Sequence, residues 1–280
     1  TEDLPNVYAI QEQMQLLPLS AYVQGGTYTA PQGTYSPENE FVPVNKVLSM
    51  SPVEFFNTVN ALMQENKPAP DDAPLLEEIS AIGVGPGLTF DASILGENAA
   101  ERWVQMLQSL RATLAAEGVN YSHKLGQWTY YGRPIGDFGT AYHYRAMVAL
   151  VGLGANTVDV AIYPKTDADI TGETLTGEKT YTLHFETLPP VLEGGFWSIT
   201  AYNEENFLID NPINRYCIND RSDFQRNEDG TLDIVLSKEA PENTSNWLPV
   251  SDGQFHLFMR IYLPDMAALD DWQPPVIRQQ

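Results

Sequence analysis

The sequence predicts an α+β protein of several subdomains, in which an N-terminal all-α subdomain precedes an antiparallel, jelly-roll-like β-sandwich. Apolar residues recur at helical spacing from Ser51 to Asn156, and after that point they alternate with polar residues at strand spacing. Turn signals, not helix-length segments, separate the alternating runs, which favours antiparallel strands. The expected divisions are an extended segment over 1–50, a helical subdomain over 51–156 and the sandwich over 157–280.

The first 156 residues are expected to contain a short helix, a loop and then four longer helices. The short helix is expected within residues 1–20, and the stretch 24–39 is rich in Gly, Thr, Tyr and Pro, as loops are. Ser51 and Glu54 form a capping box with Pro52 at the first helical position, which marks the start of the first longer helix. Three more helices are expected, over residues 73–82, 97–117 and 138–152.

The C-terminal part contains five runs in which every second side chain is apolar. Because successive side chains of a strand point to opposite faces, each run predicts one buried face and one mixed face. The runs occupy residues 158–163, 181–186, 197–202, 232–237 and 255–262. The buried faces are expected to include Trp197, Ile199, Phe255, Leu257 and Met259.

The mixed faces carry more aromatic and ionisable side chains than a solvated sheet face needs. Arg260 lies between Phe258 and Tyr262 on one such face, so we expect a covered guanidinium. This surface is either a ligand groove or the seat of another packed segment, which would be the helical subdomain or a partner domain. We expect the following side chains to converge on one surface: His184, Tyr202, His256, Arg260 and Tyr262.

A second group of candidates lies in the segment 211–220, whose sequence is NPINRYCIND. The Asn211-Pro212 pair predicts a turn after a central strand. The polar residues that follow the turn either contact a ligand or bond strand ends together. We include three of them, Asn214, Arg215 and Tyr216, in the predicted ligand-binding set with the five residues above.

Metal and cofactor chemistry have weak support in the sequence. His184, Glu186 and His256 are residue types that bind zinc or iron, but they lie on separate runs without ligand spacing, so no metal site is predicted. Residues 167–173 resemble a calcium loop whose series of ligands stops early, and a hairpin turn is favoured there. The sequence contains no nucleotide-binding or nucleophile-elbow motif, so no cofactor is predicted and catalytic residues are left unassigned.

The amino-acid composition limits the classes of partner that the chain can bind. The chain has 15 basic and 37 acidic residues, a net charge of −22, which repels nucleic acids and anionic lipid surfaces. Cys217 is the single cysteine, so an internal disulfide is excluded. The sequence has no apolar run of about 18–20 residues, the length of a membrane span. Since it starts with Thr1 rather than Met, we expect a processed or truncated chain.

Several stretches resemble the C-terminal part of the paired bacterial families of unknown function numbered 1254 and 1214. They include SPVEFFNTVNAL from residue 51, YRAMVALVGLGAN from residue 144 and FHLFMRIYLPD from residue 255. The most specific is the stretch over 188–223, which contains GGFWSITAYNEENFLIDNPINRYCIND. The resemblance implies a helical subdomain followed by a jelly-roll sandwich. It also implies a further N-terminal β-sandwich domain, absent here, and export to the periplasm or the medium.

These observations lead to one main functional hypothesis and two alternatives. The main hypothesis is an exported protein that binds a glycan or another small polar ligand on its sandwich, since aromatic rings and hydroxyl-bonding side chains are what a glycan site requires. One alternative is a hydrolase or lyase whose site is shared with the missing N-terminal domain. The other is a purely structural sandwich. An enzyme predicts a closed pocket with an acid or base of strongly shifted pKa, whereas a binding module predicts an open groove lined by aromatic residues.

Overall fold

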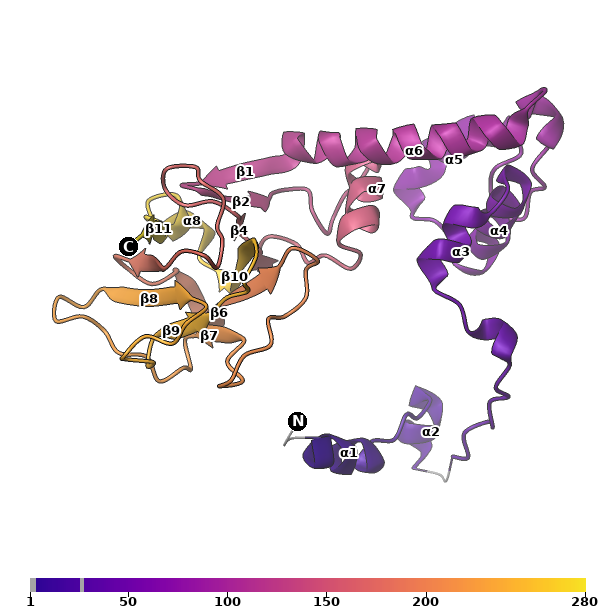
Figure 1. The fold of residues 1–280 in the computed structure, drawn as a ribbon. Helices are drawn as coiled ribbons and strands as arrows, with labels where there is room; N and C mark the ends of the chain where they lie inside the picture. The colour runs from indigo at the N-terminus through magenta and orange to yellow at the C-terminus, as the bar shows by residue number, and fades with distance from the viewer. Residues whose placement is uncertain (1–3, 26–27) are drawn as a thin grey trace. The chain divides into compact units, whose positions relative to one another are not determined.

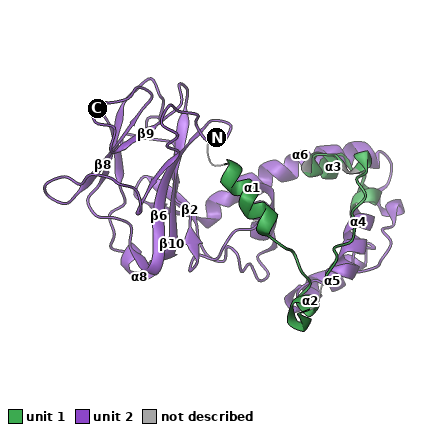
Figure 2. Cartoon of the chain, turned by 90° about the horizontal axis from the view of Figure 1, so that it is seen from below, with its two compact units in different colours: residues 1–55 green, residues 56–280 purple. Residues whose placement is uncertain are grey.

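The computed structural model describes residues 4–25 and 28–280, and the chain forms two compact units, residues 1–55 and 56–280 (Figure 1, Figure 2). The first unit is a series of short helices. Pro18 is the N-cap of its second helix, and a proline without an N–H cannot continue the first, so two helices stand where one was expected. The elements of this unit are α1 (Leu4–Gln13), α2 (Leu19–Gln24), the 3-10 helix η1 (Pro37–Asn39) and α3 (Pro43–Ser49).

Helix α4 (Pro52–Glu65) begins in the first unit and continues into the second. Its start agrees with the predicted capping box, because the hydroxyl of Ser51 accepts a hydrogen bond from the backbone N–H of Glu54 at 3.3 Å. Farther along α4, the buried Asn60 side chain donates to the carbonyls of Gly83 and Leu88, both at 2.9 Å. These bonds tie the glycine-rich loop after α5 to α4.

Most of the other helices of the second unit precede the main run of strands along the chain, and α8 lies near the C-terminus. Helix α7 begins later than expected because Ala141 N–H bonds to the carbonyl of Phe138 in a turn, and its Tyr144, Met147 and Val148 enter the core. The helices of this unit are η2 (Pro70–Asp72), α5 (Ala73–Ser80), η3 (Ala92–Leu95), α6 (Ala99–Glu117), η4 (Gly118–Tyr121), α7 (Tyr142–Val151) and α8 (Met266–Leu269).

The strands form two sheets, called here the larger and the smaller sheet (Figure 1). The larger has the strand order β1-β2-β4-β10-β6-β7, with β3 also paired to β10, and the smaller has the order β11-β5-β8-β9. The larger sheet contains β1 (Ser122–Leu125), β2 (Trp128–Tyr131), β3 (Ala161–Ile162), β4 (Lys165–Thr166), β6 (Val191–Asn203), β7 (Cys217–Asn219) and β10 (Phe255–Pro264). The smaller contains β5 (Tyr181–Phe185), β8 (Leu232–Ser237), β9 (Trp247–Pro249) and β11 (Val276–Gln279).

The two sheets pack face to face through the apolar sides of their strands. Rings from the two sheets meet in the core, with Phe185 and Trp197 at 5.5 Å and Tyr181 and Phe255 at 6.0 Å between centroids. The predicted burial is confirmed, since all five residues expected in the core are at most 2% exposed. The alternation in the sequence therefore assigns the inner and outer faces of β5, β6, β8 and β10 correctly.

Three features of the strands differ from the expectation. A hairpin, β1–β2, lies inside the stretch predicted to be helical and joins the larger sheet through β4. The first predicted run is reduced to β3, because residues 157–160 form a turn that leaves Val160 exposed. Within the described residues every strand pair is antiparallel except β8 and β9, which pair in parallel.

Candidate functional site

The outer face of the larger sheet is where most predicted site residues lie. Strands β6 and β10 are paired so that Tyr202 is opposite His256, Thr200 opposite Phe258 and Ser198 opposite Arg260. Since side chains directly opposite in a sheet share a face, these six and the next pair form one continuous surface. We call it the polar-aromatic face: Phe196, Ser198, Thr200, Tyr202, His256, Phe258, Arg260 and Tyr262.

Arg260 is held on this face by neutral groups. Its guanidinium donates to the hydroxyl of Thr200 at 3.2 Å and to that of Tyr202 at 2.7 Å. It also lies over the rings of Tyr202 and Phe258, at 5.6 and 5.8 Å from their centroids. No carboxylate of the described residues is within ion-pair distance, so the positive charge of Arg260 is oriented but not neutralised. This arrangement differs from an enclosed Arg–carboxylate clamp.

His256 is the most deeply buried ionisable group of the polar-aromatic face. It is 6% exposed, and its Nε2 is the buried side-chain atom that has no hydrogen-bond partner within the described chain. Its ring stacks on that of Tyr202 with centroids 5.7 Å apart. Burial lowers the pKa of His256, the Lys165 cation lowers it further and the Asp167 carboxylate opposes them. The imidazole is therefore neutral at pH 7.

At the Tyr262 end of the polar-aromatic face, ring stacking and hydrogen bonds between side chains hold the residues together. The ring of Tyr262 stacks on Phe196 with centroids 4.5 Å apart. A hydrogen bond with Tyr163 raises the pKa of Tyr262, and burial adds to the effect. Asn156 in turn donates to the hydroxyl of Tyr163 at 2.9 Å. The Tyr262 phenol therefore stays protonated and acts as a hydrogen-bonding group rather than as a base.

A cleft of about 830 Å³ adjoins the polar-aromatic face, and its size is in the range of ligand pockets, about 300–1,000 Å³. One wall comes from β2, β4 and β10 of the larger sheet and includes Thr129, Tyr131, Tyr163, Lys165 and Phe258. The other wall comes from the end of α7 and the residues that follow it, up to residue 155, and is mainly aliphatic. The cleft thus offers ring faces and polar groups on one side and an apolar surface on the other.

Lys165 is the cation of this cleft. It is half-buried, and its Nζ lies 5.6 Å from the centroid of the Phe258 ring, opposite it across β4 and β10. Within the described chain it makes no ion pair at 4.0 Å or less. Lys165 and Arg260 therefore approach the same ring, and neither is paired with an acid.

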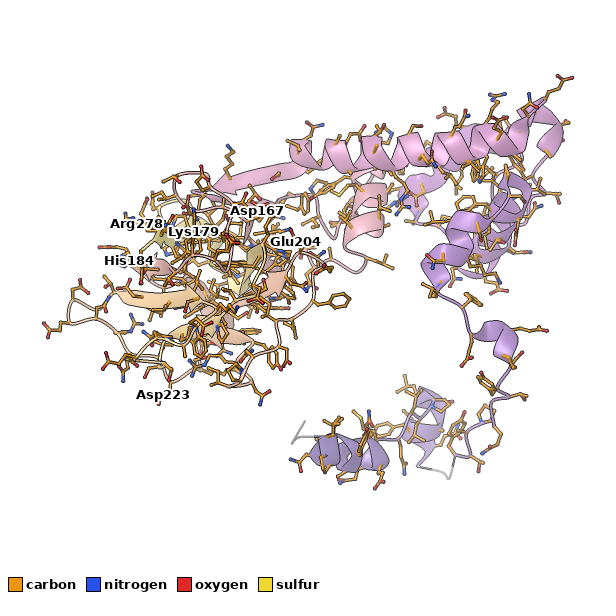
Figure 3. All side chains as sticks on the ribbon, in the orientation of Figure 1. Asp167, Lys179, His184, Glu204, Asp223 and Arg278 are labelled. Carbon is orange, nitrogen blue, oxygen red and sulfur yellow. The ribbon has the colours of Figure 1, made fainter. Side chains whose placement is uncertain are left out.

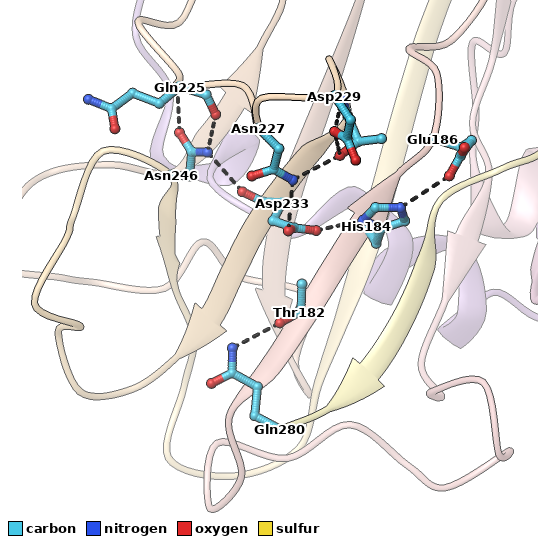
Figure 4. A network of polar contacts seen from close by, with 10 residues as sticks. Thr182, His184, Glu186, Gln225, Asn227, Asp229, Asp233, Asn246 and Gln280 are labelled. Atoms are coloured by element: carbon cyan, nitrogen blue, oxygen red, sulfur yellow. Dashed lines mark hydrogen bonds and ion pairs between the residues drawn. The ribbon is translucent and has the colours of Figure 1, made fainter.

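His184 does not belong to this site, which corrects the prediction that five residues converge. It lies on β5 of the smaller sheet, and the outer faces of two packed sheets point in opposite directions. Its Nδ1 is 2.7 Å from the Asp233 carboxylate and its Nε2 is 3.4 Å from that of Glu186 (Figure 4). The hydrogen bond to Asp233 raises the pKa of His184, partial burial opposes the rise and Glu186 contributes to it.

The residues of the segment 211–220 serve the fold rather than the cleft. The guanidinium of Arg215 donates to the backbone carbonyls of Thr244, Ser245 and Trp247, at 2.6, 3.1 and 2.9 Å. Asn214 and Tyr216 bond to each other at 3.5 Å, at the edge of the larger sheet. None of the three lines the cleft. The contacts of Arg215 agree with the alternative that this segment bonds strand ends together.

Sequence reasoning missed the cleft residues Thr129, Tyr131 and Lys165. A signal existed for Lys165, because it follows Tyr163 by two positions and so shares its face. A weaker signal existed for the hairpin that supplies the other two. The pair Gly126-Gln127 separates two four-residue strands, and Gly126 has a φ of 61°, which a two-residue hairpin turn that starts with glycine requires.

Two further findings limit the chemistry of the described chain. No group of three or more His, Cys, Asp or Glu side chains among its described residues is arranged to hold a metal ion. His184 and His256, which were considered as metal ligands, lie on different sheets. Among the described helices there is none whose length and apolarity would let it cross a membrane.

Comparisons with known proteins agree with the resemblance over the C-terminal part. Residues 160–266 match the family model described as "Protein of unknown function (DUF1214)". The chain is similar in structure to the VPA0106 protein from Vibrio parahaemolyticus, with a TM-score of 0.63 and 24% identity over 93% of this chain. An uncharacterized protein from Burkholderia cenocepacia is 15% identical, with a TM-score of 0.32 over 79% of this chain and 52% of its own.

The similarity to the Vibrio protein supports the fold and carries no activity. The chain spans 61% of the length of the Vibrio protein. No protein of curated function matches it. Residues 160–266 are therefore similar to this family of unknown function, and the chain shares its fold with the Vibrio protein.

Proposed function

We propose that the cleft beside the polar-aromatic face binds a small polar ligand, with a glycan as the leading class. The observation that carries the proposal is the joining of aromatic rings and hydrogen-bonding groups in the lining of one cleft of ligand size. Tyr131, Tyr163 and Phe258 offer rings for the C–H faces of a sugar, and Thr129, Lys165 and Asn206 offer bonds to hydroxyl groups.

Binding is favoured over hydrolysis by the groups that line the cleft. Glycoside hydrolysis ordinarily uses two carboxylates about 5–10 Å apart. Among the described residues that line this cleft there is no Asp and no Glu. Burial raises the pKa of Tyr130, which lines the cleft, and a hydrogen bond with Tyr163 raises that of the nearby Tyr262, which disfavours both phenols as bases.

Location and further domains belong to the same proposal. The resemblance implies a periplasmic or secreted protein and an N-terminal β-sandwich domain, and a glycan is a ligand that a protein meets outside the cytoplasm. Fractionation of the native host, with N-terminal sequencing and intact mass of the native protein, checks both. Recovery of the native protein from the cytoplasm, starting near Thr1, would contradict them.

The proposed binding is tested by filling the cleft from an exposed position. Thr129 is exposed on β2 and lines the cleft, and a strand accepts Trp at such a site. Calorimetry against a panel of mono- and disaccharides should show that Thr129→Trp abolishes binding found with the unchanged chain. The matched control is Thr182→Trp, on β5 of the smaller sheet, which should bind normally. Equal binding by both variants would place the ligand elsewhere.

A further inference from the structure

We infer that the ligand of this cleft carries a single negative charge, a carboxylate, which Lys165 binds. The inference rests on the proposed function and adds the chemical class of the ligand. It is drawn from the juxtaposition of an unpaired lysine, an aromatic floor and an aliphatic wall in one cleft.

Lys165 is placed for recognition rather than for stability. It is half-buried, lines the cleft and has no described carboxylate within ion-pair distance. A partly buried cation without an anion loses solvation and gains little in return. The same lysine on a strand surface would ordinarily reach water or an acidic neighbour. Its Nζ instead lies over the ring of Phe258, which also lines the cleft. A bound carboxylate would supply the missing counter-charge.

The surroundings of Lys165 add positive character without crowding the site. The Arg260 guanidinium lies 5.8 Å from the centroid of the same Phe258 ring, with its donors directed at neutral hydroxyls. Asp167, whose position Figure 3 labels, is an exposed acid that acts on His256 and makes no ion pair with Lys165 at 4.0 Å or less. Lys165 and Arg260 thus place two cations beside the Phe258 ring, in a chain of net charge −22.

The contrast between these cations and the acidic chain favours a ligand with one negative charge over a ligand with many. A polyanion would be repelled by the acidic surface as its further charges left the cleft. A ligand with one carboxylate meets the local attraction and little of the repulsion. The helix-side wall, with Val148, Val151 and Leu153, has no hydrogen-bonding side chain to offer, so it suits the apolar face of the ligand body.

The test compares carboxylates with neutral analogues of the same shape. One pair is an aldobiouronic acid, which has one uronate and one neutral sugar, and the corresponding neutral disaccharide. The second pair is 4-phenylbutanoate and 4-phenylbutanamide, and an oligouronate with several charges is the polyanion. Affinities are measured by calorimetry with the full chain, at about 0.05 M and about 0.5 M salt, because screening weakens charge contacts.

The variant is Lys165→Met, which keeps the length of the side chain and removes its charge. The control is Lys179→Met, which removes the same charge from another half-buried lysine that does not line the cleft (Figure 3). In at least one pair the carboxylate should bind about tenfold or more tightly than its neutral analogue, as a charge-assisted bond allows. The preference should fall with salt, vanish in Lys165→Met and persist in Lys179→Met.

The outcomes separate the inference from the proposed function. Neutral analogues that bind as tightly as the carboxylates would overturn the inference and leave the proposed function standing. An oligouronate that binds more tightly than the singly charged acid would overturn the single-charge part. If no member of either pair binds, both the inference and the proposed function are wrong.

Discussion

Among single residues, Arg260 of the polar-aromatic face shows that the role of a charged side chain cannot be inferred until its contacts are known. Arg260 was expected to be covered by its neighbours along β10, and it does lie over Phe258. Its second ring and its strongest hydrogen bond come from Tyr202, on the paired strand β6. The environment of Arg260 therefore depends on how β10 is paired with β6, and the sequence of β10 alone does not reveal that pairing.

The bonds of Arg260 predict the result of a conservative substitution. Arg260→Lys keeps the charge but loses the planar fork that reaches Thr200 and Tyr202 together. We expect the free energy of unfolding to fall by about 1 kcal/mol, because the group is only half-buried and one bond can be replaced. Urea denaturation measures this loss, with Arg278→Lys on β11 as the exposed control. A loss above about 3 kcal/mol would mean that Arg260 is a buried clamp instead.

His184 predicts a dependence of stability on pH. Its folded-state pKa is raised, with Asp233 as the main cause, so its protonated form stabilises the fold. This contribution is complete below the unfolded-state pKa of about 6.5 and is lost as the pH rises through the folded-state pKa. We expect less than about 1 kcal/mol, because Asp233 and Glu186 are exposed enough for water to screen them.

The measurement for His184 is a series of urea denaturations from about pH 5 to about pH 9. The unchanged chain should lose stability relative to His184→Gln between about pH 6 and pH 8. His256 acts in the opposite direction, since its lowered pKa costs stability as the pH falls below about 6.5, and it is common to both proteins. Curves that stay parallel over the whole range would contradict the assignment to His184.

At the scale of elements, the central strands β6 and β10 could be predicted and the edge elements could not. Alternation over β6 and β10 is long enough to define an apolar face, and burial of that face drives the packing. The four-residue strands β1 and β2 have no such signal, because their pairing with each other and with β4 stabilises them. The parallel pairing of β8 with β9 depends on the path of the loop between them, which no periodicity encodes.

The packing of β6 predicts the largest effect of a single substitution. Trp197 is 2% exposed and contacts Phe185 of the smaller sheet and Phe224. Trp197→Ala should lower the free energy of unfolding by about 3–5 kcal/mol, as large aromatic deletions in cores do. The control is Phe207→Ala, because Phe207 is 68% exposed. If the two variants unfold at the same urea concentration, the inner face of β6 has been assigned wrongly.

The residues of the candidate site on β6 and β10 could likewise be predicted, and those from other elements could not. Tyr202, His256, Arg260 and Tyr262 share a face because their positions differ by even numbers along two paired strands. Whether β5 joins the same sheet is a matter of long-range pairing, and His184 was therefore grouped with them wrongly. The aliphatic wall comes from α7, which is brought to the sheet by tertiary packing alone. The jelly-roll connectivity stays a prediction.

At the scale of the whole molecule, the acidic surface and the cationic cleft are the features that bear on function. A net charge of −22 disfavours nucleic acid and polyanions as partners. Lys165 lines the cleft of the second unit, and Arg260 lies beside the same Phe258 ring, so two cations are close to this cleft. We expect selectivity to come from the contrast between the acidic chain and these two cations, which attract a small anionic ligand to the cleft.

The most direct test of the central claim is a nitrogen–proton correlation NMR titration of the full chain with the tightest ligand from the saccharide panel. Binding in the cleft should shift the backbone amides of residues 128–131, 151–155, 163–165 and 256–260, which lie in or next to its lining. The amides of 181–186 and 232–237, on the smaller sheet, should not move. Shifts centred on His184 and Asp233, or saturable binding without any shift around Lys165, would contradict it.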